Sequence, residues 1–368
     1  MKNFKISLVA SAVALAISSH ASAGLTLYDQ DNTTFSTDGL INTFYVNSQV
    51  DDVDNALDRT QSRIKMGFLP NWIGFNFAKE VDGLKLGARS SFWVSINDAN
   101  TNLTDSMIDV RQFYGTIDAD WGQVLIGKDF ALFGRSNILG DELLMGYGQV
   151  NSDGLVDGAN VSFGNIGTGY LYPFPNAQIT YRTPKSNGFQ LAVGLMDPSK
   201  SATGSEENTP RIEAELTFDT ELSEGVPFKA WLGGMSQSSD SGATTVDSNG
   251  VSYGMTIKMG GVSLTASGFN ASGVGTAGLA NLVTADTADV EGYLVQASYS
   301  VGSERFVASY GENEGGTTPN ANDLDAQNSA VAWFHTVNSN LKLVAEYDRS
   351  KSDTRETDTV ALGAVLTW

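Results

Sequence analysis

The chain contains few residues that could carry out acid–base, nucleophilic or metal chemistry. It has no Cys, which excludes a disulfide framework, a thiolate zinc site and a thiol nucleophile. Of its two His residues, His20 lies in a segment that we expect to be removed, so only His335 remains. A Ser-His-Asn hydrolase would need both a nucleophile and an orienting group at this His. Because Trp333 and Phe334 precede it, His335 is more typical of an aromatic band near an interface, and we expect no catalytic residue, cofactor or metal.

Two acidic runs leave one alternative open. Asp51-Asp52-Val53-Asp54 and Glu206-Glu207 could supply oxygen ligands to Ca²⁺, although such runs more often form a solvated surface. The chain carries 22 Lys and Arg against 42 Asp and Glu, a net charge of -20. This balance would repel phosphates, so a nucleic-acid partner is excluded.

Several basic residues alternate with apolar ones. Arg63 and Lys65 flank Ile64, and Arg89 follows Ala88 in a second such stretch. Successive side chains of a strand point to opposite faces, so the basic residues share a polar face. The bases placed on this face by alternation alone are Arg63, Lys65, Lys85, Arg89 and Arg182.

The same period of two recurs in stretches of about ten residues along most of the chain. Clear examples are 84–97, 189–195, 211–218, 251–259, 293–300 and 341–348. A soluble β-sandwich has strands of about five or six residues, whereas a tilted strand that crosses a bilayer needs about nine to eleven. The connections also alternate between short turns and long polar loops, which is typical of an outer-membrane barrel.

We therefore predict an all-β fold, a 16-stranded antiparallel transmembrane β-barrel, with fourteen or eighteen strands as alternatives. The predicted strands begin near Gly39, Ser62, Leu84, Ile108, Gln123, Ala177, Phe189, Arg211, Pro227, Gly250, Val262, Val290, Glu304, Asp325, Leu341 and Thr357. The count is least secure around Leu25–Phe35 and Asn71–Lys79. A barrel of this size leaves a lumen for water and small solutes.

The first 23 residues have the features of a secretory signal peptide. Lys2 and Lys5 precede an apolar stretch that is too short to span a bilayer, and Ala21-Ser22-Ala23 fits a cleavage site. We expect residues 1–23 to be the signal and residues 24–368 to be the barrel. Removal of the signal leaves 20 Lys and Arg against 42 Asp and Glu, a net charge of -22.

Several segments, in order, resemble the general trimeric porins of Gram-negative outer membranes. They are 62–68, 110–115, 121–128, 179–184 and 187–189, together with the C-terminal 363–368. Gly363, Leu366 and Trp368 fit the family's terminal assembly signal, although the usual last residue is Phe. The resemblance implies a homotrimer that is inserted by the barrel assembly machinery among outer-membrane lipid and lipopolysaccharide.

The resemblance also implies that Asp129 to about Pro175 forms a third external loop, folded into the barrel to narrow it. In this family acidic loop residues face a basic wall across the constriction. The wall candidates are Arg63, Lys65, Arg89, Arg111, Lys128 and Arg182, and the loop candidates are Asp129, Asp141, Glu142, Asp153 and Asp157. Arg111 and Lys128 rest on the resemblance alone, since alternation does not place them in the lumen.

Three functions are compatible with these features. The first is passive diffusion of small hydrophilic solutes and ions through a water-filled trimeric channel, without enzymatic activity. The second is a substrate-specific channel of the same architecture, for sugars or for small carboxylates. Trp93 and Trp231 share the inward parity that a sugar pore would use, and basic wall residues would suit carboxylates. The third is an adhesive surface β protein, which the signal and the terminal segment oppose.

Overall fold

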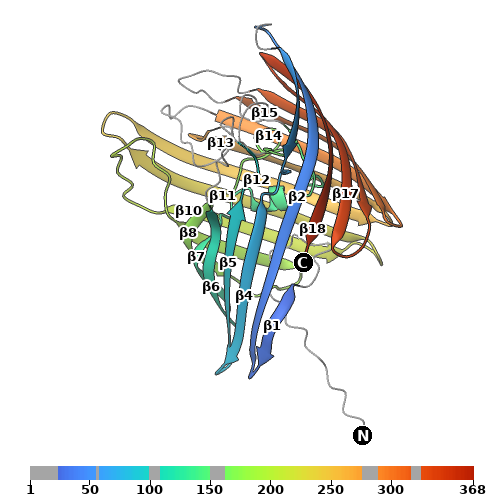
Figure 1. Ribbon diagram of the computed structural model, residues 1–368. Helices are drawn as coiled ribbons and strands as arrows, with labels where there is room; N and C mark the ends of the chain where they lie inside the picture. The colour runs from blue at the N-terminus through green and yellow to red at the C-terminus, as the bar shows by residue number, and fades with distance from the viewer. Residues whose placement is uncertain (1–23, 55–57, 99–107, 150–161, 276–288, 316–324) are drawn as a thin grey trace.

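The computed structural model describes residues 24–54, 58–98, 108–149, 162–275, 289–315 and 325–368 (Figure 1). The predicted signal peptide lies outside the described residues. The strands are β1 Leu25–Gln30, β2 Thr33–Asp52, β3 Arg59–Lys65, β4 Asn71–Val81, β5 Leu84–Val94, β6 Asp109–Ala119, β7 Gly122–Phe130, β8 Pro175–Arg182, β9 Phe189–Met196, β10 Arg211–Glu221, β11 Pro227–Asp240, β12 Thr245–Met259, β13 Val262–Ser272, β14 Asp289–Val301, β15 Glu304–Gly315, β16 Ala326–Thr336, β17 Leu341–Ser352 and β18 Arg355–Thr367, and the one helix among them is α1 Arg135–Leu139. No helix in the described part of the chain is long and apolar enough to cross a membrane.

The eighteen strand segments occupy sixteen positions in a closed antiparallel barrel. β3 and β4 both pair with the same edge of β2, β3 along its C-terminal half and β4 along its N-terminal half. On the other edge of β2, β18 pairs as far as Leu40 and β1 continues from Thr37. The predicted count of sixteen is therefore confirmed, and the two regions marked as least secure hold the two extra segments.

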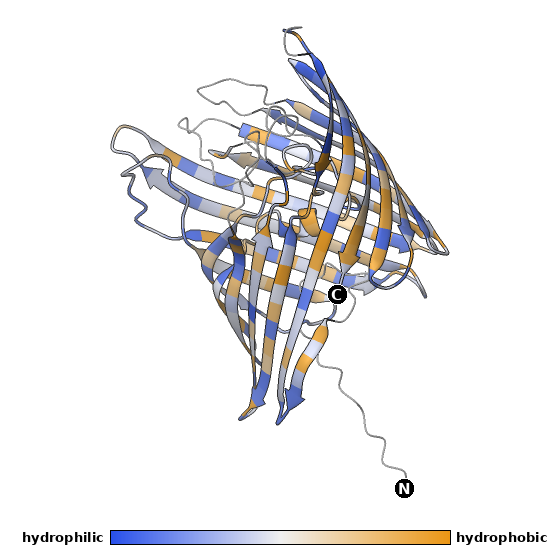
Figure 2. Cartoon of the chain, in the orientation of Figure 1, coloured by the Kyte–Doolittle hydropathy of each residue, from blue (hydrophilic) through white to orange (hydrophobic). Residues whose placement is uncertain are grey.

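Hydrophilic and hydrophobic residues alternate along these strands (Figure 2), and the exposure of their side chains alternates with them. In β9, Leu191, Val193 and Leu195 are exposed on the outer face, while Ala192 and Met196 are buried on the inner face. In β3, the side chain of Ile64 is 61% exposed, whereas neighbouring Lys65 is 0% exposed. An apolar outer surface is what a lipid environment requires of a barrel.

Tight turns join the strands at one end of the barrel, which we call the short-turn end. Asp82 and Gly83 link β4 to β5 with φ values of 50° and 78°, and Gly260 and Gly302 adopt a φ of 59° in the turns after β12 and β14. Two-residue turns with positive φ match the twist of the strands that they join. The opposite end carries the long connections.

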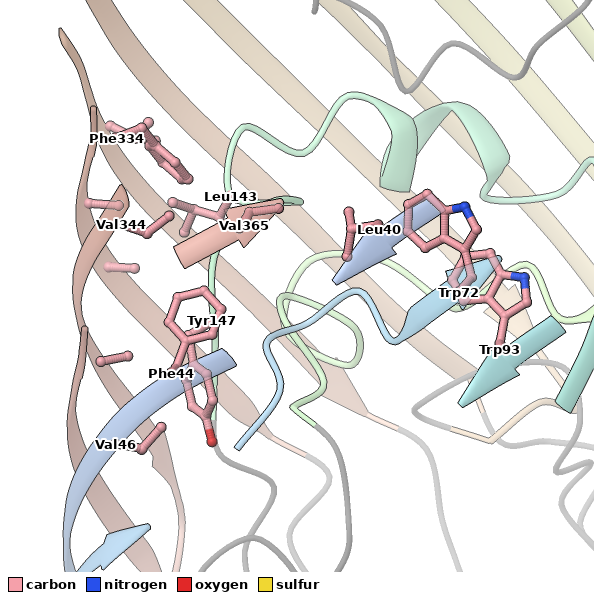
Figure 3. Close-up of a cluster of buried hydrophobic side chains, with 14 of the residues drawn as sticks. Leu40, Phe44, Val46, Trp72, Trp93, Leu143, Tyr147, Phe334, Val344 and Val365 are labelled. Carbon is pink, nitrogen blue, oxygen red and sulfur yellow. The ribbon is translucent and has the colours of Figure 1, made fainter. Parts of the chain in front are cut away.

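The segment between β7 and β8 turns inward instead of staying at the rim. Its described parts, 131–149 and 162–174, are together called the 131–174 segment. They include α1 and contain many buried side chains. Leu143 and Tyr147 of this segment join the largest cluster of buried apolar residues, with Phe44, Val344 and other wall residues (Figure 3). Tyr147 lies 5.7 Å from Phe44 between ring centroids. This apolar contact fixes the middle of the segment to β2 and β17.

Candidate pore constriction

Besides Ser252 of β12 and Gln296 of β14, which accept from the amides of Gly134 and Glu142, acceptors of the inner wall hold the backbone of the 131–174 segment at three places. Glu213 of β10 accepts hydrogen bonds from the amides of Leu132 and Phe133 at 2.7 and 2.8 Å. Glu346 of β17 accepts from the amides of Tyr147 and Gly148 at 3.0 and 2.5 Å. The third place is on β15.

There the Asn313 side chain accepts from the amide of Gly169 at 2.7 Å. A carboxylate that accepts amide hydrogen bonds is a strong partner, since bonds to charged groups contribute about 1.5–3 kcal/mol each. The segment is thus attached to β10, which is two strands from β8, and to β15 and β17, which lie far from β7 and β8 around the barrel.

Asp141 is the polar centre of the segment's own packing. Its buried carboxylate accepts hydrogen bonds from the amide of Leu143 and from the side chains of Asn165, Tyr170 and Gln296. Burial raises the pKa of the Asp141 carboxyl, and these hydrogen bonds act in the opposite direction. Asp141 therefore joins the two described parts of the segment to each other and to β14.

Glu142 binds the wall directly. Its carboxylate accepts from Arg305 of β15 at 2.7 Å, from Ser263 of β13 at 2.7 Å and from Ser298 of β14 at 3.2 Å. Asp141 and Glu142 therefore face β13, β14 and β15. The expectation that these two acids face the basic wall of the first six strands is wrong, because the segment extends past that wall to the opposite side.

Asp129 lies beside the predicted wall, but the prediction that it belongs to the loop is wrong, because it is part of β7 and pairs with Asn176 of β8. It is buried, accepts from Gln112 at 2.9 Å and pairs with Arg135 at 3.4 Å. Asp153 and Asp157 lie outside the described residues.

Arg89 is the predicted wall residue whose surroundings best fit a charged lumen. Its guanidinium donates to both oxygens of Asp38 at 2.7 and 3.0 Å, and its Nε donates to Gln112 at 2.8 Å. Asp38 lies on β2 and also accepts from Trp72 and Asn76. Sequence reasoning missed Asp38, although it shares the inward parity of Leu40 and Phe44.

Arg63 and Lys65 face inward, as alternation predicts. Arg63 donates to the backbone oxygen of Asp98 at 3.2 Å, and Lys65 is fully buried. Neither lines the main cavity, and Arg182 also lies outside its lining. These three bases are therefore not grouped with Arg89 around one opening.

Arg111 reaches the interior because of an irregularity in β6. Between two paired positions, β5 advances from Ser91 to Trp93 while β6 advances by three residues, which breaks the alternation. The Arg111 guanidinium donates to the Tyr172 hydroxyl at 2.9 Å and lies 4.9 Å from the centre of the Trp93 ring. Arg111 thus contacts the 131–174 segment.

Lys128 is placed on the other side of the wall. It pairs across strands with Phe113 of β6 and Ala177 of β8, and the side chain of Phe113 is 62% exposed on the outer face. Residues directly opposite each other in antiparallel strands share a face. The prediction that Lys128 lies on the lumen wall is therefore wrong. The alternation of the sequence, which does not place Lys128 in the lumen, agrees with this outer position.

A cavity of about 1680 Å³ lies inside the barrel, toward the short-turn end. Of the predicted wall and loop residues of the constriction, Arg89, Asp141 and Glu142 line this cavity. Sequence reasoning missed the other basic residues of its lining, which include Arg135, Lys229, Lys258, Arg305 and Lys342. Apart from Arg135, these lie on β11 to β17 at inward positions, where the same alternation could have identified them.

The C-terminal residues close the barrel. Trp368 and Gly39 exchange backbone hydrogen bonds at 3.1 and 3.2 Å, and the Trp368 ring covers the position that a side chain at residue 39 would occupy. A Cβ on Gly363 would lie 2.3 Å from the ring of Phe44. Leu366 is exposed on the outer face. Gly363 thus has a packing role, whatever its role in assembly.

The alternative metal and catalytic residues have protein partners. Asp52 pairs with Arg355 at 2.7 Å, and Glu207 accepts from Ser205 and Ser239. His335 Nδ1 lies 2.7 Å from Glu304. Within the described ranges, no group of three or more His, Asp or Glu residues is arranged to hold a metal ion.

A family model for Gram-negative porins matches residues 10–355. The chain belongs to this porin family. Its barrel is therefore an outer-membrane channel. A search of curated protein sequences finds no match.

Solved porin structures share the fold of this porin at low sequence identity. The anion-selective porin from Comamonas acidovorans is 13% identical, with 91% of this chain and 100% of that chain covered and a TM-score of 0.69. The outer-membrane channel DcaP of Acinetobacter baumannii is 16% identical, with 94% and 100% covered and a TM-score of 0.66. In vitro folded OmpT of Vibrio cholerae, in a trimer form, is 16% identical, with 92% and 100% covered and a TM-score of 0.56.

Proposed function

We propose that this porin is a passive channel for small hydrophilic solutes and ions, narrowed by the 131–174 segment, with no enzymatic activity. The observation that carries the proposal is the attachment of this segment to β10, β15 and β17 beside a cavity of about 1680 Å³. The attachments hold the segment across the interior, and the cavity keeps charged groups in contact with water. Such a lumen favours polar solutes, because an apolar solute must displace ordered water.

Conductance across planar bilayers tests this proposal. The purified protein should give steady steps of one size, without any added substrate. Block by one class of solute at low concentration would favour the substrate-specific channel. Absence of conductance from folded protein would contradict both and would favour the adhesive protein.

We further propose that the channel is a homotrimer inserted among outer-membrane lipid and lipopolysaccharide by the barrel assembly machinery. The trimer form of the Vibrio cholerae OmpT structure supports this state. The unboiled protein should migrate in detergent gels as a species about three times the mass of the boiled chain. Identical migration before and after boiling would contradict a stable trimer.

Residues 1–23 are proposed to be a cleaved signal peptide, on the basis of their sequence pattern. N-terminal sequencing of protein purified from outer membranes should begin at Gly24. A sequence that begins at Met1 in the membrane-inserted protein would refute the cleavage.

The buried state of the inward tryptophans does not favour a sugar channel. Trp93 stacks on Trp72 at 4.8 Å between ring centroids and is 4% exposed, while Trp231 is 5% exposed and donates to Asn137. Rings covered in this way offer little surface to a passing sugar. The small-carboxylate alternative has more support, because Ser263, Ser298 and Arg305 of the inner wall donate hydrogen bonds to the carboxylate of Glu142.

A further inference from the structure

Three lysines of the inner wall form no ion pair within the described part of the chain. Lys229 of β11, Lys258 of β12 and Lys342 of β17 line the cavity. None of them takes part in an ion pair with a described residue, whereas other bases of the same lining do. The paired bases are Arg89 with Asp38, Lys85 with Glu80, and Arg305 with Glu142.

The carboxylates of the cavity are largely compensated. Besides the three acids already paired, Asp219 pairs with Lys185 at 2.9 Å. Glu304 lies 2.7 Å from His335, which offsets the charge of Glu304 only when the imidazole is protonated. Asp141 is buried, so Asp118 and Glu304 are the two acids of the lining without a permanently cationic partner among the described residues, against three lysines. Uncompensated positive charge therefore exceeds uncompensated negative charge in the cavity.

Hydroxyl groups lie beside these lysines in the wall. The backbone register pairs Lys229 with Thr256, Lys258 with Ser263, and Lys342 with Thr336. Ser298 lies on β14 in register with Ser263. Ammonium and hydroxyl donors in this arrangement suit the oxygens of a small anion.

The wall already binds one carboxylate. The side chain of Glu142 accepts from Ser263, Ser298 and Arg305 within 3.2 Å. The cross-strand neighbour of Ser263 is Lys258, which makes no ion pair with a described residue. A carboxylate from solution would therefore find the same kinds of donors next to the position that Glu142 occupies.

We propose that the inner face of β11 to β17 at the short-turn end binds small carboxylate anions, and that Lys229, Lys258 and Lys342 make the channel anion-selective. This inference rests on the proposed channel function. Charges that line a narrow passage with low-dielectric walls raise the local concentration of their counter-ions. The selective residues then lie on the side of the barrel opposite to the wall predicted from the sequence.

The test is the reversal potential in a KCl gradient near 0.1 M, where screening is moderate. The unmodified protein should prefer Cl⁻, and the combined variant K229Q/K258Q/K342Q should lose roughly three-fold or more of that preference. The matched variant K229R/K258R/K342R keeps the charge and should keep the preference. K351Q removes an exposed charge at the opposite end of β17 and should change nothing.

Succinate provides a second measurement, because it carries the proposed chemistry. The concentration that half-blocks the K⁺ current should rise roughly ten-fold in the glutamine variant and stay unchanged in the arginine variant. If the triple glutamine variant does not fold, K258Q alone replaces it, since Lys258 is exposed to the cavity.

Two results would overturn the inference while leaving the channel intact. One is normal conductance with the same reversal potential and the same succinate block in the unmodified and glutamine forms. The other is a cation preference of the unmodified protein. Absence of any conductance would instead contradict the proposed channel itself.

Discussion

At the scale of single residues, Arg89 and Asp38 form the best-defined charge pair of the lumen. Each would leave an uncompensated charge in the cavity if the other were neutralised. Their side chains are 14% and 25% exposed, so the pair is only partly screened by water. The pair therefore contributes an orientation to the local field but little net charge.

Neutralisation of each partner should shift ion selectivity in opposite directions. R89Q leaves Asp38 uncompensated and should move the reversal potential toward the value of a cation-selective channel. D38N should move the reversal potential toward the value of an anion-selective channel. The double variant should lie within about two-fold of the unmodified permeability ratio, because both charges are removed. Reversal potentials of the three variants check this. Shifts of the same sign in both single variants would contradict the pairing.

The buried carboxyl of Asp141 should make stability depend on pH. Its pKa is raised above the ordinary value of 3.8, so the folded protein holds this proton more tightly than the unfolded chain. The contribution of Asp141 to stability therefore falls as pH rises from about 3.8 through the raised pKa.

The D141N variant provides the comparison, because it cannot titrate at this position. The melting temperature of D141N relative to that of the unmodified protein should rise between about pH 4 and about pH 8, because only the unmodified protein loses the Asp141 contribution. Other carboxyls contribute equally to both proteins and cancel. Equal pH dependence in the two proteins would show that Asp141 does not titrate in this range.

At the scale of elements, the position of the 131–174 segment depends on contacts with distant strands. Glu346 supplies one oxygen to each of the two amides that it holds, of Tyr147 and Gly148. Near the start of the segment, a single carboxylate oxygen of Glu213 accepts from two amides, those of Leu132 and Phe133. Loss of one such acceptor leaves a buried amide without a partner, at a cost of about 1–3 kcal/mol.

The E346Q variant should therefore loosen the middle of the segment. A glutamine side chain has one acceptor oxygen, so one of the two amides loses its partner. Single-channel recordings should show greater open-channel noise and more frequent closures than the unmodified protein. The control variant is E356Q. Glu356 lies on β18 at the end of the barrel with the long connections, where it pairs with Lys351 and Arg349, and E356Q should behave like the unmodified protein. Quiet, unchanged traces for E346Q would contradict this role.

At the scale of the whole molecule, closure of the barrel joins the first described strands, β1 and β2, to the last strand, β18. β1 and β18 share one position beside β2, and Trp368 bonds to Gly39. Close packing of Phe44 beneath Gly363 leaves no room for a side chain there. A defect at this junction opens the ring and leaves β2 and β18 with unpaired edges, which closure otherwise removes.

The G363L variant should therefore reduce the yield of folded barrel several-fold, by an overpacking cost of about 1–3 kcal/mol or more. The double variant F44A/G363L frees the space and should restore part of the yield. Heat-dependent migration in detergent gels measures the folded fraction. Failure of F44A to improve G363L would contradict the role of the Phe44 ring, since the other close atom at this position is the backbone oxygen of Thr43.

The sequence by itself determined the barrel, the count of sixteen strands and the inward parity of Arg63, Lys65, Arg89 and Arg182. These follow from local alternation, which needs no knowledge of distant contacts. Even Asp38 and the lysines of β11 to β17 were within reach of the same rule. The family resemblance instead places the basic wall on the first six strands, so the predicted wall did not include these residues.

Only the tertiary structure decided which charges meet. The 131–174 segment has no period that fixes its path, and its position depends on acceptors such as Glu213, Asn313 and Glu346 on strands far away in the sequence. Those contacts turned Asp141 and Glu142 toward β13 to β15. An irregularity in β6 brought Arg111 inward, and cross-strand register put Lys128 outside. Alternation sorts residues onto faces, but the distance between two faces of a lumen depends on closure of the whole barrel.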